Sequence, residues 1–243
     1  MTQIIDVRGP LIPNDYKWIY DIFEMECTCP NDISMTLQSA LEKQDDIVLR
    51  INSPGGYVTV GADMYELIRS SKVNVEARIV GNCCSAATYL ACAANRATMS
   101  PLGQYMIHRS AISGAGGNTN DFASIVESLN ETDKAIAYTY SLKTGLSQEE
   151  IIELMDKTTW MNATTAKSYG FIDEILFSDV TDQTINIVNS KPINTEQDYL
   201  INEAIVRNMI ANKENVLKQK NKDLLNTEKA KMNLKLLELG GYI

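Results

Sequence analysis

Histidine is almost absent from this sequence, since the 243 residues contain only His108. Any mechanism that needs an imidazole must use this residue, and a metal site built from two histidines cannot form within one chain. Cysteine is also scarce, and no two cysteines have the C-x-x-C spacing; the five are Cys27, Cys29, Cys83, Cys84 and Cys92. Neither a disulfide framework nor a zinc site is expected, and reduced thiols in a cytoplasm fit this usage.

Positive charge is in short supply as well. The chain has 22 basic and 31 acidic side chains, and this deficit argues against nucleic-acid binding, which needs a surplus of Lys and Arg. No apolar run approaches the roughly 18 to 20 residues that span a membrane. The first ten residues, MTQIIDVRGP, lack the organisation of a signal peptide. We therefore expect a soluble cytoplasmic protein with no membrane or nucleic-acid partner.

Two segments repeat the order strand, glycine-containing turn, helix. The apolar residues 47–51 stop at Asn52-Ser53-Pro54-Gly55-Gly56, and apolar residues then recur at helical spacing over 58–68. In the second unit, the strand at 73–80 is rich in β-branched residues. A turn at Gly81–Cys84 and a helix of small residues at 85–94 are expected to follow it.

Further strands are expected at 97–99 and 105–108. The alternation of strands and helices predicts an α/β fold with a mainly parallel sheet, whose ligand sites lie at the carboxyl ends of the strands.

The residue pattern in the second half of the chain predicts mainly helices. After the loop Gly114–Gly117, residues 119–143 predict a long helix with Phe122, Ile125, Leu129 and Ile136 on one face. Ser147 and Glu150 have the spacing of a capping box, which opens another helix. A short helix at 164–169 and a closing strand at 171–177 complete this part.

Three regions are expected along the chain. Residues 1–178 form the domain with the strand-turn-helix units, and 179–199 are a polar, turn-rich linker. Residues 200–243 form a helical tail with eight basic and five acidic side chains, so its net charge is opposite in sign to that of the rest. A coiled coil or a helix that docks on its own domain or on a partner subunit fits this tail equally.

Ser85 follows a predicted turn and begins a predicted helix, where free backbone N–H groups would favour a nucleophile. Serine at this place is also a common helix cap. Gly55-Gly56 ends the preceding strand, and glycine permits the close approach to substrate that an oxyanion hole needs. His108 ends another predicted strand. The three turns are therefore expected to converge at one edge of the sheet.

These residues resemble a known family. The motifs are Ile51-Asn52-Ser53-Pro54-Gly55-Gly56, Gly81-x-x-x-Ser85, Met106-Ile107-His108 and Tyr169-Gly170-Phe171-Ile172-Asp173. In this order they are similar to the Clp-type serine peptidases over about residues 1–178, and the segment Met155–Trp160 resembles the phage branch of head maturation proteases. The resemblance implies a Clp/crotonase-like fold and a homo-oligomeric ring. It also implies that no cofactor or metal takes part.

The resemblance also implies roles for individual residues. Ser85 corresponds to the nucleophile and His108 to the general base. The backbone N–H groups of Gly56 and Ala86 would form the oxyanion hole.

A peptide substrate would pair with an extended edge at Gly55–Val58, which includes Tyr57, and at Gly114–Gly117. The substrate-binding residues are thus expected to be Gly55, Tyr57 and Val58.

The third member of the triad departs from the family pattern. An ungapped count from Gly145 puts the family's catalytic aspartate at Thr158, while Asp156 lies two residues earlier. A threonine would stabilise an imidazolium poorly, so Asp156 is favoured. In the family, the residue aligned with Asp156 makes ring-interface ion pairs. Asp173 is interpreted as a turn or capping residue.

Cys83 and Cys84 precede Ser85 and are interpreted as small buried hydrophobic residues. A cysteine nucleophile is the alternative, although neither cysteine falls at the matching position.

The leading hypothesis is a serine endopeptidase that processes phage capsid or scaffold precursors. The alternatives are a housekeeping Clp proteolytic subunit that works with a ring ATPase, a crotonase-type acyl-CoA enzyme, and a structural assembly protein with weak catalysis.

Overall fold

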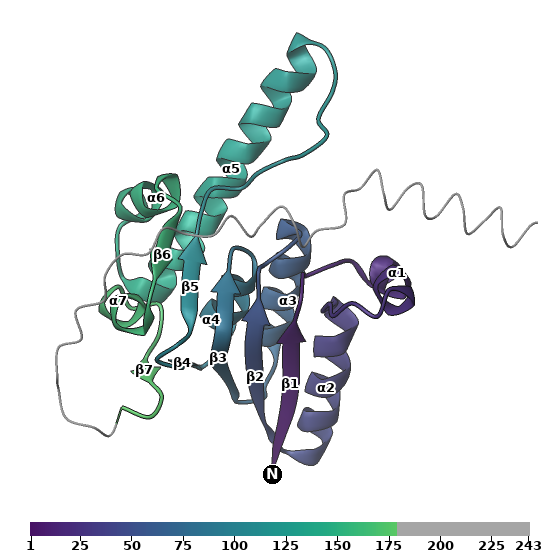
Figure 1. Ribbon diagram of the computed structural model, residues 1–243, viewed down its shortest axis with the longest axis vertical. Helices are drawn as coiled ribbons and strands as arrows, with labels where there is room; N and C mark the ends of the chain where they lie inside the picture. The colour runs from purple at the N-terminus through teal and green to yellow at the C-terminus, as the bar shows by residue number, and fades with distance from the viewer. Residues whose placement is uncertain (179–243) are drawn as a thin grey trace, which may run out of the picture. The chain divides into compact units, whose positions relative to one another are not determined.

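A seven-stranded sheet organises residues 1–178, the part of the chain that the computed structural model describes (Figure 1). Neighbouring strands are parallel along the order β1 (Thr2–Arg8), β2 (Asp46–Ser53), β3 (Val75–Cys84), β4 (Arg96–Met99) and β7 (Glu174–Ile175). β5 (Gln104–Ile107) pairs in parallel with the end of β3, and β6 (Thr159–Met161) pairs antiparallel with β5. The expected α/β fold with a mainly parallel sheet is confirmed.

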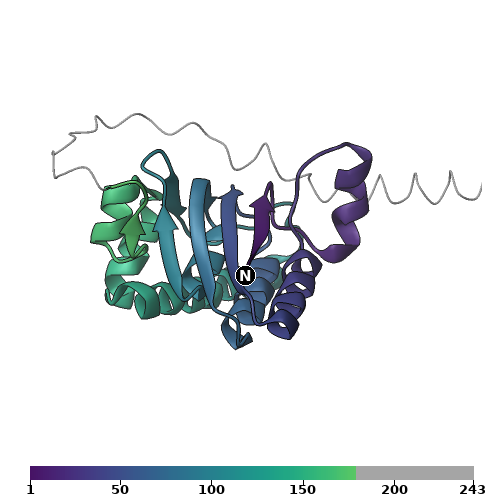
Figure 2. The same cartoon turned by 90° about the horizontal axis from the view of Figure 1, so that it is seen from below.

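The helices differ in how deeply they are buried. Their bounds are α1 (Lys17–Ile22), α2 (Pro30–Lys43), α3 (Val58–Ser70), α4 (Ala87–Ala93), α5 (Thr119–Thr144), α6 (Gln148–Asp156) and α7 (Ala163–Ser168), with a 3-10 turn η1 (Asn14–Tyr16) before α1. Figure 2 shows helices lined up along one side of the row of strands. All seven residues of α4 are buried, because small side chains let this helix pack between the sheet and its neighbours. No helix among residues 1–178 is both long and apolar enough to cross a membrane.

The expected turn at Gly81–Cys84 is wrong, because these residues continue β3. The first part of β3 pairs with β2 and β4, and after an irregularity in register its last residues pair with β5. Gly81 is needed where the side chain of Asn52 crosses the strand, since a Cβ on this glycine would lie 2.4 Å from Asn52 Oδ1. A glycine in a strand therefore marks a close approach here rather than a turn.

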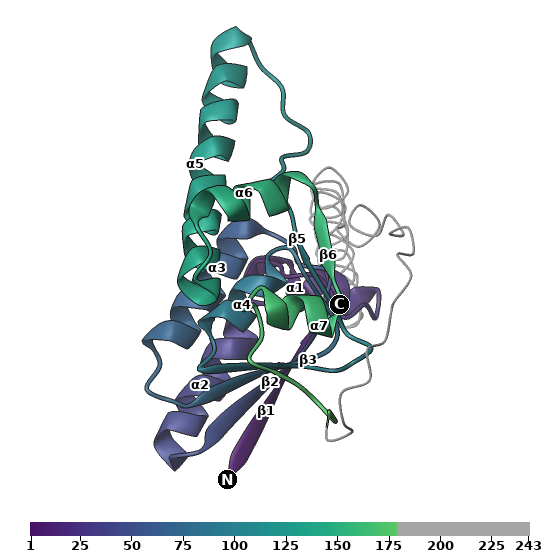
Figure 3. The ribbon, with the colours of Figure 1, turned by 90° about the vertical axis from the view of Figure 1, so that its left-hand side faces the viewer.

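The face of α5 that the sequence assigned to the core is only partly buried. Ile136 is buried, but Phe122 is 47% exposed and the first turns of the helix extend beyond the sheet (Figure 3). The capping box of Ser147 and Glu150 is confirmed at the start of α6.

Other expectations need correction or lie outside the described residues. The closing strand at 171–177 shrinks to β7, which is held by pairing with β4. β1, α1, α2 and β6 were not predicted. The linker at 179–199 and the tail at 200–243 lie outside the described residues.

Candidate active site

Ser85 lies on the tight connection between β3 and α4. Its φ is +52°, a value that non-glycine residues seldom adopt, and such backbone strain clusters at functional sites. The Ser85 N–H donates to the carbonyl oxygen of Met106 at 2.9 Å, which ties this turn to β5. The N-cap of α4 is Ala86, and no side chain caps the helix. The interpretation of Ser85 as a helix cap is therefore wrong.

The side chain of Ser85 meets the only imidazole of the chain. The distance from Ser85 Oγ to His108 Nε2 is 2.7 Å, and both residues are half-buried. His108 is in place because β5 ends at Ile107, so the next residue leaves the sheet beside the end of β3. A neutral imidazole with an unprotonated Nε2 can accept the serine proton at this distance.

Gly55 and Gly56 form a turn directly against the nucleophile. A Cβ on Gly55 would lie 2.7 Å from Ser85 Cβ and 3.0 Å from the nitrogen of Ala86, so only glycine allows this approach. Leu11 N–H donates to the Gly55 carbonyl oxygen at 2.8 Å, and Tyr57 N–H donates to the Leu11 carbonyl oxygen at 3.1 Å. Because successive N–H groups of an extended segment point to opposite sides, the Gly56 N–H faces away from Leu11.

The expected substrate edge is shorter than the sequence suggested. Val58 is the first residue of α3, so the extended segment ends at its N-cap, Tyr57. The edge is shorter because the helical pattern begins at Val58, and a residue in the first helical turn does not continue a strand edge. Leu11 already covers one side of the segment, as the isolated bridge to Gly56 shows. The ring of Tyr57 packs against that of Tyr16, with centroids 6.2 Å apart.

A buried polar network lies beneath Ser85. Thr88 is fully buried, and its Oγ1 donates to the carbonyl oxygen of Ser85 at 2.6 Å. The same hydroxyl lies 2.6 Å from the hydroxyl of Tyr140, which belongs to α5. Burial raises the pKa of Tyr140 well above its usual value, so this phenol stays protonated. These hydrogen bonds connect the strained turn at Ser85 to α4 and α5 and so stabilise it.

Asp156 lies at the end of α6, and the hydrogen bond at its Oδ1 comes from Arg109 Nε at 2.6 Å. This bond from Arg109 holds the pKa of Asp156 below its ordinary range. The structure thus brings Asp156 to the residue that follows His108. Thr158 is exposed, with a φ of +48°. Asp173 accepts the Ala97 N–H at 2.6 Å and therefore ties strands together.

Two residues near the site were not predicted from the sequence, Arg109 and its second partner, Asp133. Asp133 is 3% exposed, and its Oδ2 accepts from Arg109 Nη1 at 3.2 Å. The spacing of residues in the sequence could have indicated that Asp133 is buried. Asp133 lies three, four and seven residues before Ile136, Ala137 and Tyr140, which form the buried stripe of α5. A charged residue on such a stripe needs a partner.

The cysteines next to the nucleophile are buried thiols. Cys83 and Cys84 are 0% and 2% exposed, and burial raises the pKa of Cys83 well above its usual value. The interpretation of both as small buried residues is confirmed, and the alternative of a cysteine nucleophile loses support because the thiolate is the reactive form. None of the five cysteines forms a disulfide, and all five lie within residues 1–178.

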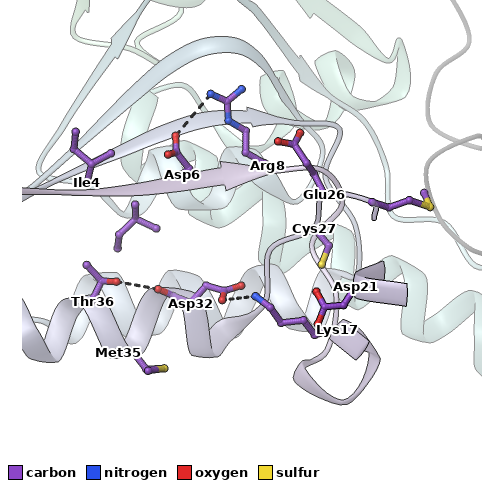
Figure 4. Close-up of a pocket in the computed structure, with 12 residues that line it drawn as sticks. Ile4, Asp6, Arg8, Lys17, Asp21, Glu26, Cys27, Asp32, Met35 and Thr36 are labelled. Carbon is purple, nitrogen blue, oxygen red and sulfur yellow. Dashed lines mark hydrogen bonds and ion pairs between the residues drawn. The ribbon is translucent and has the colours of Figure 1, made fainter. Parts of the chain in front are cut away.

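A separate cavity of about 530 Å³ lies between β1, α2 and residues 17–27 (Figure 4). Lys17 and Asp32 form an ion pair at its wall, and burial raises the pKa of Cys27 beside them to about 11. None of the predicted catalytic residues lines this cavity. No group of three or more His, Cys, Asp or Glu side chains within residues 1–178 is placed to hold a metal ion.

A serine hydroxyl on a strained turn, a histidine within hydrogen-bond distance and an adjacent pair of glycines define a serine hydrolase on an α/β sheet. Residues 22–179 match the family model described as Clp protease. The chain belongs to the Clp protease family, whose proteolytic subunits are serine endopeptidases. The resemblance seen in the sequence is thereby confirmed at the level of the family.

Curated relatives agree with this assignment. The ATP-dependent Clp protease proteolytic subunit 2 of Thermobifida fusca is 34% identical over 151 residues, which cover 60% of this chain and 74% of the relative. Subunit 1 of the same protease from Streptomyces avermitilis is 35% identical over 146 residues, or 59% of this chain and 67% of the relative. The proteolytic subunit from Streptococcus pneumoniae is 33% identical over 143 residues, or 56% and 72%.

Proposed function

We propose that this chain hydrolyses peptide bonds through an acyl-enzyme on Ser85. The observation that carries the proposal is the 2.7 Å contact between Ser85 Oγ and His108 Nε2. His108 takes the proton as Oγ bonds to the scissile carbonyl carbon, and it then gives this proton to the leaving amine as the peptide C–N bond breaks. Water then attacks the carbonyl carbon of the acyl-enzyme while His108 takes a proton from the water. His108 gives this proton to Ser85 Oγ as the bond between Oγ and the acyl carbon breaks.

The oxyanion of each tetrahedral intermediate would be held by the N–H groups of Gly56 and Ala86. The outward direction of the Gly56 N–H and the closeness of Gly55 to Ala86 support this role. Losing one such donor typically lowers kcat by about 10²-fold or more. The substrate strand would pair along the segment Gly55–Tyr57 through the backbone groups of Gly56, because these face away from Leu11. Val58 would line the end of this subsite.

Asp156 is the proposed third member of the triad, with Thr158 as the alternative. Its hydrogen bond from Arg109, the residue that follows His108, and the lowered pKa of its carboxyl support a group that is ionised at neutral pH. Separate replacements, Asp156→Ala and Thr158→Ala, identify the orienting group by kcat on a peptide substrate. Full activity in both variants would show that neither residue serves.

A fluorophosphonate probe tests the nucleophile. It is expected to label the wild-type chain at Ser85, as mass measurement of the labelled peptide would show, and to leave Ser85→Ala unlabelled. Persistent labelling of the mutant would remove Ser85 from its role. Turnover of acyl-CoA thioesters without cleavage of peptides would instead favour the crotonase alternative.

The biological role that we propose is the processing of phage capsid or scaffold precursors in the cytoplasm of a bacterial host or inside the procapsid. The support is the likeness of Met155–Trp160 to the phage branch. The relatives named ATP-dependent subunits favour the second candidate, a proteolytic subunit that works with a ring ATPase.

Co-expression with a capsid or scaffold precursor separates these two roles. Defined products with the wild type and an intact precursor with Ser85→Ala are expected for a maturation protease. Degradation of folded proteins only when a host ring ATPase is added would establish the second role. An intact precursor and no protein degradation would favour a structural assembly protein.

A homo-oligomeric ring is part of the proposal. The exposed apolar side chains on the protruding half of α5, such as Phe122 and Val126, support it because a partner subunit could cover them. Light scattering gives the mass of the assembly directly. A monomer at micromolar concentration would contradict this part of the proposal.

A further inference from the structure

Asp133 is a buried carboxylate that has no role in the proposed peptidase mechanism. It lies on the buried stripe of α5, and its side chain is 5% exposed. A charge in such a place is expensive unless it is paired and hydrogen-bonded. Both oxygens have partners, because Oδ1 accepts the Ser110 N–H at 2.7 Å and Oδ2 accepts from Arg109 Nη1 at 3.2 Å.

These partners are the two residues that follow His108. The sheet holds the chain up to Ile107, which pairs with Thr159 on β6. Beyond it, α5 holds Ser110 twice, through the N–H to Asp133 and through Ser110 Oγ to the carbonyl oxygen of Leu129 at 3.3 Å. His108 therefore lies between one point fixed by the sheet and one fixed by the helix.

Arg109 extends the arrangement to a third element. Its guanidinium bonds to Asp133 on α5 and to Asp156 on α6, so one cation lies between two carboxylates. Charge-assisted bonds of this kind are shorter and stronger than neutral ones. Figure 3 shows α5 and α6 side by side near the end of β5.

We propose that Asp133 is a positioning residue for His108: through the Ser110 N–H and Arg109 it sets the path of the chain after β5, and so the place of the imidazole beside Ser85. This inference rests on the proposed function. Asp133 acts through the backbone and through Arg109, without touching the substrate. Proton transfer depends steeply on such placement, since a displacement of about 1 Å can cost about 10²-fold in rate.

Two variants of the full chain test the role. Asp133→Asn keeps an oxygen that can accept the Ser110 N–H but removes the charge that faces Arg109. The double variant Arg109→Gln/Asp133→Asn removes both charges, so no unpaired cation remains if the single variant folds poorly. Glu131→Gln is the matched control, because Glu131 is an exposed acid on the same helix and pairs with Lys134.

Three readouts are measured on each variant. They are the rate of fluorophosphonate labelling at Ser85, kcat and KM on a fluorogenic peptide, and the ¹⁵N chemical shifts of the imidazole, which is unique in this chain. We expect Asp133→Asn and the double variant to label at least about 10-fold more slowly, to lower kcat with KM unchanged, and to move the imidazole signals. Glu131→Gln should match the wild type in all three.

Wild-type labelling and unmoved imidazole signals in both variants would overturn the proposal. Loss of the folded far-UV circular dichroism in both would also overturn it, because Asp133 would then serve stability alone. Failure of the proposed function is a separate result. In that case the wild type neither labels nor cleaves peptides, while the imidazole signals still report whether Asp133 positions His108.

Discussion

Gly55 lies so close to Ser85 that a Cβ on the glycine would be 2.7 Å from the Cβ of the serine, and the φ of Gly55 is +100°. Gly55→Ala is therefore expected to destabilise the fold by about 1–3 kcal/mol and to slow labelling of Ser85 by at least about 10-fold, because the turn must move away. Urea unfolding and probe kinetics measure the two effects.

Gly116→Ala is the control for this substitution, since nothing lies within 4 Å of the Cβ position there. It should leave both quantities close to wild type, because neither readout uses a peptide strand that would pair with the expected edge at Gly114–Gly117. An equal loss in the two variants would show that contact with Ser85 is not the cause.

His108→Ala should lower kcat/KM for a peptide by about 10⁴-fold or more, because no second imidazole exists to take the proton from Ser85. The measurement is steady-state cleavage of a fluorogenic peptide, with circular dichroism as the check on folding. Retention of activity within tenfold would require another base.

Thr88→Val should cost about 1–3 kcal/mol of stability, since it leaves the buried hydroxyl of Tyr140 without its 2.6 Å partner. Labelling should also slow, because Thr88 holds the carbonyl oxygen of Ser85. A double-mutant cycle with Tyr140→Phe isolates the pair. Strict additivity of the two losses would argue that the hydroxyls do not interact.

Alkylation of the native chain by iodoacetamide at pH 8 should be slow. Burial raises the pKa values of Cys27 and Cys92 to about 11, so only about one thiol in a thousand is ionised at each site. Mass measurement should show rapid modification only after unfolding, with labelling of Ser85 unaffected. Rapid loss of activity with modification at Cys83 or Cys84 would favour the alternative hypothesis that a cysteine is the nucleophile.

The pair of Arg109 and Asp156 should make stability fall on acidification. The hydrogen bond from Arg109 lowers the pKa of Asp156 below its ordinary 3.8. A carboxyl whose pKa is lower in the folded than in the unfolded chain stabilises the fold. This contribution is complete above the unfolded pKa of 3.8 and is lost as the pH falls through the folded pKa. The difference in urea midpoint between wild type and Asp156→Asn should shrink from pH 6 to pH 3.

Asp63→Asn, on the exposed side of α3, provides the comparison for an acid away from this pair. A difference for Asp156→Asn that stays constant with pH would contradict the ion pair as the cause.

Local patterns in the sequence were enough to predict the α/β class, the capping box of α6 and the residues Ser85 and His108. These features depend on neighbours in the chain: apolar periodicity, turn residues and the order of short motifs. The four motifs also indicated the Clp family, which the comparisons confirmed.

Other features depend on contacts between segments that are far apart in the chain. The pairing of Asp133 with Arg109 joins residues 24 positions apart, and the length of β3 depends on its pairing with β5. The exposure of Phe122 depends on how far α5 extends past the sheet. Ser85 and His108 follow from the sequence alone as the candidates for the chemistry. The fold decided what holds them, because contacts between distant segments form only when helices and strands pack and leave no local pattern in the chain.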